Sequence, residues 1–395
     1  MKWSERKYIP ALGGLLALIV AMGAGRFAYT PLLPFMQDGV GFDDSIAGLI
    51  ASSNYAGYLA GALVFGYLPR GWRVAGFRLS LVLMVLVTAA MGVLESLAVW
   101  YLLRFVAGVL SAAIFVLGSL LVMEALAQRS AIHLSGLMYS GVGVGIALSA
   151  VGVAPLCEYW SWQGAWIGLG LLSIPPVVLA WMWVKSEPAP VAPAAAPVNT
   201  AVVQHTAATP SLRGVFIRLG SAYFLEGMGY VVSATFLVLI IRTLLDSPLA
   251  GTISWLLVGV SAAISTSVWP LVAARVGEAR ALMLAHGIQA VGIVCPVFWP
   301  TLAGAYVGSI LFGGTIMGIV TLTMMYGRKL APEKAGAAVG LLTALFGAGQ
   351  IIAPALAGYV AKVEGSFTLP LVAAAIAVAV GGLILLPDAR KRKGA

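Results

Sequence analysis

Apolar residues fill long stretches along nearly the whole chain, and polar residues gather in the short breaks between them. Most stretches run for about 20 residues, the length of helix that crosses about 30 Å of hydrocarbon. A helix satisfies all of its backbone hydrogen bonds internally in such a medium. The pattern therefore predicts twelve membrane-spanning helices, over residues 8–36, 45–68, 77–94, 97–127, 134–156, 161–184, 214–241, 249–273, 279–298, 302–325, 336–360 and 367–386.

A proline- and alanine-rich stretch divides these helices into two sets of six. Residues 185–213 contain five prolines among alanines, a composition typical of an extended linker. We therefore expect an all-α polytopic membrane protein of two pseudo-symmetric six-helix bundles. Residues 8–184 and 214–387 are the predicted bundles, 185–213 a cytoplasmic linker, and 388–395 a basic cytoplasmic tail.

The two predicted bundles repeat one another at an offset of 204 residues. LSGLMYSGVGVG (134–145) aligns with AVGLLTALFGAG (338–349), and GAGRFA (23–28) aligns with GMGYVV (227–232), which sets Arg26 against Tyr230. Homologous halves predict a substrate site between them near the membrane midplane, and alternating access by rocking of one half against the other.

Lysine and arginine positions set the expected orientation. Of 23 such residues, 19 fall in segments that are cytoplasmic if the N-terminus is inside. Arg242 and Lys362 fall in outer loops, and Arg26 and Arg104 lie within the membrane. The positive-inside rule predicts both termini in the cytoplasm, here of a bacterial inner (plasma) membrane. The dispersed net charge of +9 does not indicate a nucleic-acid partner.

Composition excludes a soluble globular protein, because 61% of the residues are hydrophobic and only 9% are charged. The basic start of the chain leads into an apolar run without a small-residue cleavage site, so we expect an uncleaved first helix.

Two runs of sequence resemble a known transporter family. GAGRFAYTPLLPFM (23–36) and ASSNYAGYLAGAL (51–63) resemble the YbfB/YjiJ branch of the major facilitator superfamily, and the six-plus-six plan resembles that superfamily over the whole chain. The resemblance implies a secondary transporter. Arg104 with Gly108 matches a pattern that the superfamily associates with proton coupling. The chain departs from the superfamily after the second helix, where Arg70 stands in the usual acidic position.

Charged residues inside the membrane are the main functional candidates, because an ion there is costly unless it faces a cavity or a partner. Arg26 lies near the midplane, and its forked donors suit a carboxylate or phosphate of the substrate. We expect Glu226, one turn from Tyr230, to be the protonatable group facing Arg26. The alternative is a static Arg26–Glu226 ion pair that locks the halves. Arg104 is a second candidate for proton coupling, although its place near a helix end would let it extend to the interface.

Uncharged polar and aromatic residues are expected to line the cavity and bind the solute: Asn54, Tyr55, Tyr58, Tyr139, Tyr230 and Gln350. Helix packing explains the second-helix members equally well. His286 is expected to be structural, and Cys157 and Cys295 to be free thiols. The sequence has no phosphate-binding or zinc-binding motif, so we expect no cofactor, no metal and no enzymatic activity.

These features predict a monomeric secondary active transporter of the lipid bilayer that moves a small solute by symport or antiport, with protons as the coupling ion. Arg26 favours an organic anion or zwitterion. Three alternatives stay open: a proton-driven exporter of lipophilic or cationic compounds with Glu226 as its binding charge, a non-transporting sensor with a transporter fold, and a membrane enzyme or lipid flippase.

Overall fold

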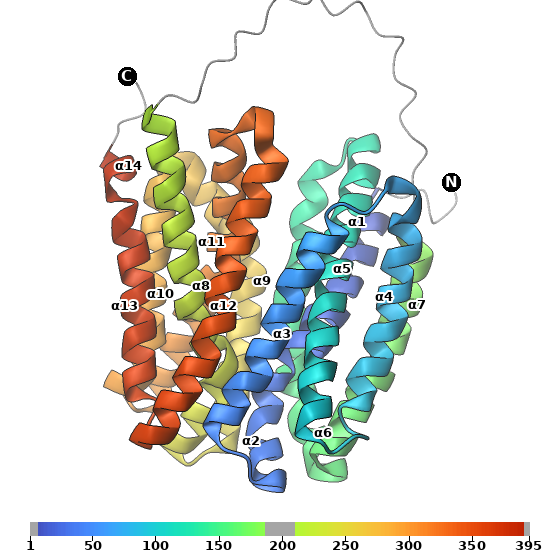
Figure 1. The fold of residues 1–395 in the computed structure, drawn as a ribbon, viewed down its shortest axis with the longest axis vertical. Coiled ribbons are helices and arrows are strands. Elements are labelled where there is room, and N and C mark those ends of the chain that lie inside the picture. Colours follow the sequence, from blue (N-terminus) through green and yellow to red (C-terminus); the bar gives the residue numbers. More distant parts are fainter. Residues whose placement is uncertain (1–6, 186–209, 391–395) are drawn as a thin grey trace, which may run out of the picture.

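The computed structural model describes residues 7–185 and 210–390, and these form one bundle of roughly parallel helices (Figure 1). Residues 186–209, most of the predicted linker, and 391–395 of the predicted tail lie outside the described residues. Helix α1 begins and α14 ends at the same end of the bundle, which we call the terminal end (Figure 1). The opposite end, where α2 leads into α3, is called the far end.

The N-terminal half consists of six crossings. The first combines α1, a π-helical segment η2 and α2, and the fifth and sixth are made by α6 and α7. The bounds are α1 (Ile9–Leu18), η2 (Ile19–Phe27), α2 (Tyr29–Val40), α3 (Asp44–Phe65), α4 (Arg70–Ala90), α5 (Leu97–Gln128), the 3₁₀ turn η3 (Ile132–Leu134), α6 (Ser135–Leu172) and α7 (Ile174–Trp183). The chain reverses inside α6 at Trp160 and Ser161, whose backbone is not helical.

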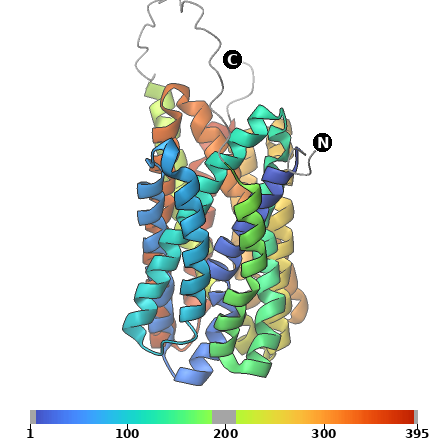
Figure 2. The ribbon, with the colours of Figure 1, turned by 90° about the vertical axis from the view of Figure 1, so that its right-hand side faces the viewer.

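The C-terminal half repeats this plan. Its bounds are α8 (Pro210–Leu245), α9 (Pro248–Val276), α10 (Glu278–Phe298), α11 (Leu302–Leu330), the 3₁₀ turn η4 (Pro332–Lys334), α12 (Ala335–Glu364), α13 (Thr368–Ile384) and α14 (Leu386–Arg390). Seen from the side, the helices of both halves run along the same long axis (Figure 2).

Nine helical segments of the described ranges are long and apolar enough to cross a membrane. One of them, Ile132–Trp183, holds two crossings because it reverses within α6. Adding α3 and the shorter α13 gives the twelve predicted crossings. Apolar side chains such as Leu86, Val291 and Ile376 are exposed on the bundle, as expected of a surface in contact with lipid.

Two predicted helix starts were placed too late. Helix α4 begins at Arg70 instead of residue 77, and α8 begins at Pro210 instead of residue 214. Hydropathy marks only the part of a helix that lies in hydrocarbon, and it misses polar first turns. Arg70 forms an ion pair of 2.5 Å with Glu124 of α5, which ties the polar start of α4 to its neighbour.

The internal repeat is visible in the packing of glycines. A Cβ atom on Gly23 would lie 2.8 Å from the Cα of Gly145, so η2 and α6 approach closely there. Their counterparts at the predicted offset, Gly227 and Gly349, make the same approach between α8 and α12. Only residues without a side chain allow two helix backbones to come so near. The same helix contact therefore occurs once in each half.

The first and seventh crossings also touch through residues that the offset pairs. Three such contacts join residues 204 apart: Arg26 with the Tyr230 hydroxyl, Thr30 with the Ala234 carbonyl, and Asp38 with Arg242. Residues related by a twofold axis meet their own counterparts only beside that axis. The pseudo-twofold axis therefore passes between these two crossings, and Arg26 lies next to it.

Candidate functional site

Arg26 lies at the end of η2, near the middle of the first crossing, and only 6% of it is exposed. Its Nη2 donates to Gln350 Oε1 at 2.7 Å and to the Tyr230 hydroxyl at 3.3 Å. Its guanidinium lies 4.7 and 4.5 Å from the ring centroids of Tyr55 and Tyr58. These five residues, called here the Arg26 cluster, come from both halves and meet at the pseudo-twofold axis.

Two buried donors of the Arg26 cluster have no hydrogen-bond partner, namely Nε of Arg26 and Nε2 of Gln350. A guanidinium only donates, so Gln350 must turn its amide oxygen toward Arg26 and leave its NH₂ group free. Within the described ranges, no acidic side chain forms an ion pair with Arg26. The cluster thus carries a positive charge and unused donors, which an anionic acceptor group would satisfy.

Arg104 supports the backbone beneath Arg26. Its Nη1 donates to the Gly25 carbonyl at 2.9 Å and its Nη2 to the Arg26 carbonyl at 3.0 Å. In a π-helix a carbonyl accepts from the N–H five residues later, but for Arg26 that residue is Pro31, which has no N–H. Arg104 supplies a donor in its place.

The expected extension of Arg104 toward the membrane interface is therefore wrong, since the residue is only 2% exposed. Because Arg104 lies near a helix end, its side chain was expected to reach water. Instead, the carbonyls of Gly25 and Arg26 in the π-helical turn of η2 accept its hydrogen bonds inside the bundle. The hydropathy pattern does not encode such a turn.

Asn54 fastens α3 to α5. Its Nδ2 donates to the Arg104 carbonyl at 2.9 Å, and the side chain is buried. A Cβ atom on Gly57 or Gly108 would collide with the backbone of the facing helix, so the two helices pack closely here. This placement favours the packing interpretation of Asn54. Asn54 bonds the backbone of Arg104, and the side chain of Arg104 in turn bonds the backbone of η2.

Glu226 does not face Arg26, contrary to the expectation. Its Oε1 accepts from Gln289 Nε2 of α10 at 2.8 Å, and its Oε2 has no partner. Four residues of an α-helix turn about 40° beyond a full circle, which aims Glu226 at α10 while Tyr230 points to the axis. A static Arg26–Glu226 ion pair is absent for the same reason.

Gln289 is a polar partner that sequence reasoning missed. It is fully buried, and the signal that could have found it is a lone amide within the apolar part of the ninth crossing. His286, one turn away, contacts the Leu282 carbonyl through Nδ1 at 2.8 Å, in agreement with the structural role expected of it. Both cysteines are free, as predicted.

Tyr139 of α6 lies at the edge of the site. It is half-buried, and its ring is 5.8 Å from that of Phe115. Tyr139 is also a neighbour of Tyr58, which is itself in the Arg26 cluster. The structure therefore gathers Tyr55, Tyr58, Tyr230 and Gln350 at Arg26, with Tyr139 one layer away.

Two ion pairs join the halves at the far end. Asp38 pairs with Arg242 at 2.6 Å, and Asp43 pairs with Lys362 at 2.8 Å. We call these the far-end pairs. Hydrogen bonds from Lys362 and from the Ile46 N–H hold the pKa of Asp43 below its usual value. Three ion pairs at the terminal end each join residues of the same half: Arg70–Glu124, Arg218–Asp388 and Lys329–Glu278.

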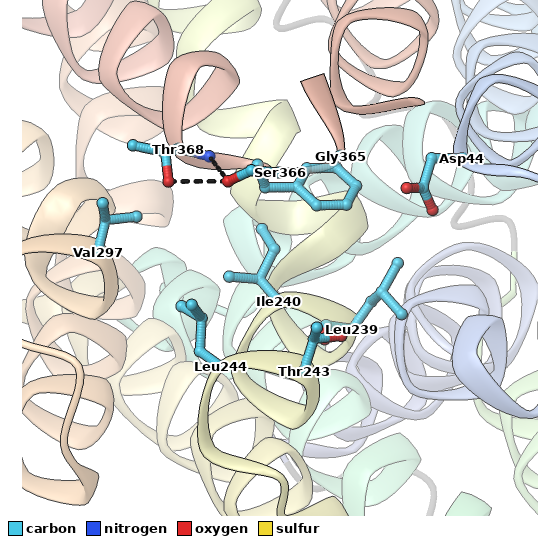
Figure 3. Close-up of a pocket in the computed structure, with 10 residues that line it drawn as sticks. Asp44, Leu239, Ile240, Thr243, Leu244, Val297, Gly365, Ser366 and Thr368 are labelled. Atoms are coloured by element: carbon cyan, nitrogen blue, oxygen red, sulfur yellow. Dashed lines mark hydrogen bonds between the residues drawn. The ribbon is translucent and has the colours of Figure 1, made fainter. Parts of the chain in front are cut away.

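Figure 3 shows a pocket of about 210 Å³. Two of its lining residues, Asp44 and Thr243, directly follow Asp43 and Arg242 of the far-end pairs in the chain. Ile240 and Thr243 of α8, together with Ser366 and Thr368, form part of its wall, and Asp44 is its contribution from the N-terminal half. None of the residues predicted to bind substrate lines this pocket. It therefore belongs to the far-end contact between the halves and not to the Arg26 cluster.

Comparisons with known proteins agree with this architecture. The profile of a family described as "Uncharacterised MFS-type transporter YbfB" matches residues 18–386. The crystal structure of a mutant of the nucleoside transporter NupG superposes with a TM-score of 0.69, covering 96% of this chain and 100% of its own, at 13% sequence identity. A likeness at that identity concerns the fold alone. No curated protein sequence matches the chain.

Proposed function

Since the chain belongs to the YbfB family of major facilitator superfamily transporters, we propose that it moves a small organic anion or zwitterion by alternating access, coupled to protons. The observation that carries this proposal is the Arg26 cluster, with a buried guanidinium, no carboxylate partner in the part of the chain that the structure describes, and two unused donors. A buried charge without a counter-ion is costly. An anionic substrate would supply the missing partner, with Gln350 and Tyr230 of the opposite half closing around it.

We assign Tyr55, Tyr58, Tyr230 and Gln350 to the substrate-facing layer with Arg26, and Tyr139 to its edge. Arg104 is assigned a positioning role, because two backbone carbonyls already occupy its guanidinium. One of these carbonyls belongs to Arg26, so Arg104 fixes the position of the Arg26 backbone.

Glu226 is assigned the proton-coupling role. Its carboxyl is enclosed, and its free Oε2 has room for a proton while Gln289 donates to Oε1. Glu226 and Tyr230 lie one turn apart on α8, and Tyr230 contacts Arg26. A movement of α8 caused by protonation of Glu226 therefore also moves Tyr230 at the anion site.

The Glu226→Gln variant, which mimics a permanently protonated carboxyl, is expected to keep exchange of substrate for substrate but to lose accumulation driven by a pH gradient. Counterflow and pH-driven uptake in proteoliposomes measure the two separately. Glu158→Gln, at a position outside the described contacts of Arg26 and Glu226, serves as the control. A Glu226→Gln protein that accumulates substrate as the wild type does would remove Glu226 from the coupling step.

The same proteoliposomes test the proposed function itself. Counterflow of labelled small carboxylates or amino-acid derivatives is the expected result. Counterflow of lipophilic cations alone would favour the exporter alternative. Binding without counterflow would favour a sensor.

In the proposed orientation both termini are cytoplasmic, in a bacterial inner membrane, and the far end faces outward. The far-end pairs then hold the outer side closed. Asp43 keeps its charge above its ordinary pKa of about 3.9, and loses it only as the pH falls through its lowered pKa. The stabilising contribution of the Asp43–Lys362 pair is therefore complete at neutral pH and lost in acid.

A covalent cross-link across the far end is expected to stop transport. In a Cys157→Ser, Cys295→Ser background, Asp43→Cys with Lys362→Cys should be joined by a short bifunctional methanethiosulfonate reagent that spans the length of the lost lysine side chain, and counterflow should stop because the outer side can no longer open. A reductant cleaves this cross-link and should restore activity, and each single cysteine variant should keep its activity in the presence of the reagent. Full activity of the cross-linked protein would show that the far end does not open during transport.

A further inference from the structure

The wall of the site in the C-terminal half is a column of three parallel aromatic rings. The centroids of Tyr223 and Phe346 lie 4.3 Å apart with 9° between the ring planes, and those of Phe346 and Tyr230 lie 5.3 Å apart with 5° between the planes. Phe346 is the half-buried member, whereas both tyrosines are almost fully enclosed. The column ends at the Tyr230 hydroxyl, which accepts from Arg26.

The N-terminal half brings a second set of rings to the same guanidinium. Tyr55, Tyr58 and Phe27 lie 4.7, 4.5 and 5.3 Å from Arg26. Tyr58 is half-buried, and Tyr223 of the opposite half is one of its neighbours. The half-buried rings of Tyr58 and Phe346 thus come to the Arg26 cluster from the two halves.

The polar and the aromatic parts of the site call for different parts of one ligand. The unpartnered donors, Arg26 Nε and Gln350 Nε2, suit the two oxygens of a carboxylate. The two faces of Phe346 are covered by Tyr223 and Tyr230, so a ligand meets the edge of this ring. A planar aromatic ring makes edge-to-face contacts with such an edge, which a linear aliphatic acid does not make.

We propose that the substrate is an aromatic carboxylate, its carboxylate bound by Arg26 and Gln350 and its ring packed against Phe346 and Tyr58. This inference rests on the proposed function and narrows it to one chemical class. Because the two rings belong to different halves, one planar substrate contacts both halves at once. Substrate binding is thereby linked to the rocking of one half against the other.

Matched ligands test the inference. Benzoate and cyclohexanecarboxylate carry the same charge and the same number of carbons, but only benzoate is planar. Titration calorimetry of the purified protein is expected to give at least a 10-fold tighter affinity for benzoate. Phe346→Leu should weaken benzoate binding by about 3- to 10-fold, the loss of one aromatic contact, and should leave cyclohexanecarboxylate unchanged. Phe298→Leu, at an exposed position at the far end of α10, is the control and should change neither affinity.

The outcomes separate this inference from the proposed function. Equal affinities for the two acids, or equal losses of both in Phe346→Leu, would overturn the aromatic class while leaving an anion transporter in place. If no carboxylate of any kind binds, the anion site itself fails. Thermal unfolding of each unliganded variant confirms that Phe346→Leu is folded, and Tyr58→Leu tests the ring of the other half in the same way.

Discussion

Replacing Arg26 with lysine is expected to lower anion binding and transport by about 10- to 100-fold, the effect of losing one charge-assisted hydrogen bond. Lysine keeps the charge and has three N–H donors, but it has no planar fork, so it cannot bond Gln350 and Tyr230 and also present two parallel N–H groups to a carboxylate. Initial rates of uptake in proteoliposomes measure the effect. Arg78→Lys, at a residue that contacts Trp181 away from the site, is the matched control and should transport normally.

A second substitution of Arg26 distinguishes a role in transport from a role in stability. Arg26→Met removes a buried charge that has no counter-ion, so this variant is expected to unfold at the same or a higher temperature than the unliganded wild type while being inactive. An Arg26→Lys protein that transports at the wild-type rate would contradict a forked anchor. A strongly destabilised Arg26→Met protein would indicate that Arg26 serves mainly to hold the halves together.

Arg104→Ala is expected to cause the largest loss of stability, about 2–6 kcal/mol in the free energy of unfolding. The change leaves the carbonyls of Gly25 and Arg26 without their donor, and each unsatisfied buried group costs roughly 1–3 kcal/mol. Chemical or thermal unfolding in detergent measures it. Arg129→Ala, at the C-cap residue of the same helix, is the comparison: Arg129 Nη1 bonds the Ala125 carbonyl one turn earlier, and its loss should change stability by less than about 1 kcal/mol.

A positioning role for Arg104 requires more than a loss of stability. Arg104→Lys keeps an N–H donor group but loses the fork that bonds the Gly25 and Arg26 carbonyls together. The variant should remain folded at low temperature and yet bind the anion more weakly than the wild type, because the backbone of Arg26 is held less firmly. If folded Arg104→Lys binds the anion as tightly as the wild type does, Arg104 has a structural role only.

The sequence predicted the membrane crossings for physical reasons that the structure explains. Apolar stretches of membrane-spanning length leave few alternatives to helices. The repeat aligned Arg26 with Tyr230, and the structure brings these two counterparts into contact. The glycine pairs that carried the repeat also pack against each other. A repeat can be read from sequence because both copies preserve the same close helix contact.

The rest of the site depended on rotations and backbone turns that hydropathy does not contain. Glu226 and Tyr230 are one turn apart, yet an angle of about 40° sends one to α10 and the other to the axis. The carbonyls that hold Arg104 are available because η2 is π-helical ahead of Pro31. Phe346 looked like an ordinary apolar residue, and only its stacking between Tyr223 and Tyr230 marks it.

Equilibrium binding of organic ions to the wild type and to Arg26→Gln tests the central claim, that a buried guanidinium without a counter-ion forms the substrate site. Titration calorimetry should detect carboxylates binding to the wild type, with binding lost in Arg26→Gln although the variant stays folded. Binding of cations only, undiminished in Arg26→Gln, would contradict the account and move the substrate charge to Glu226.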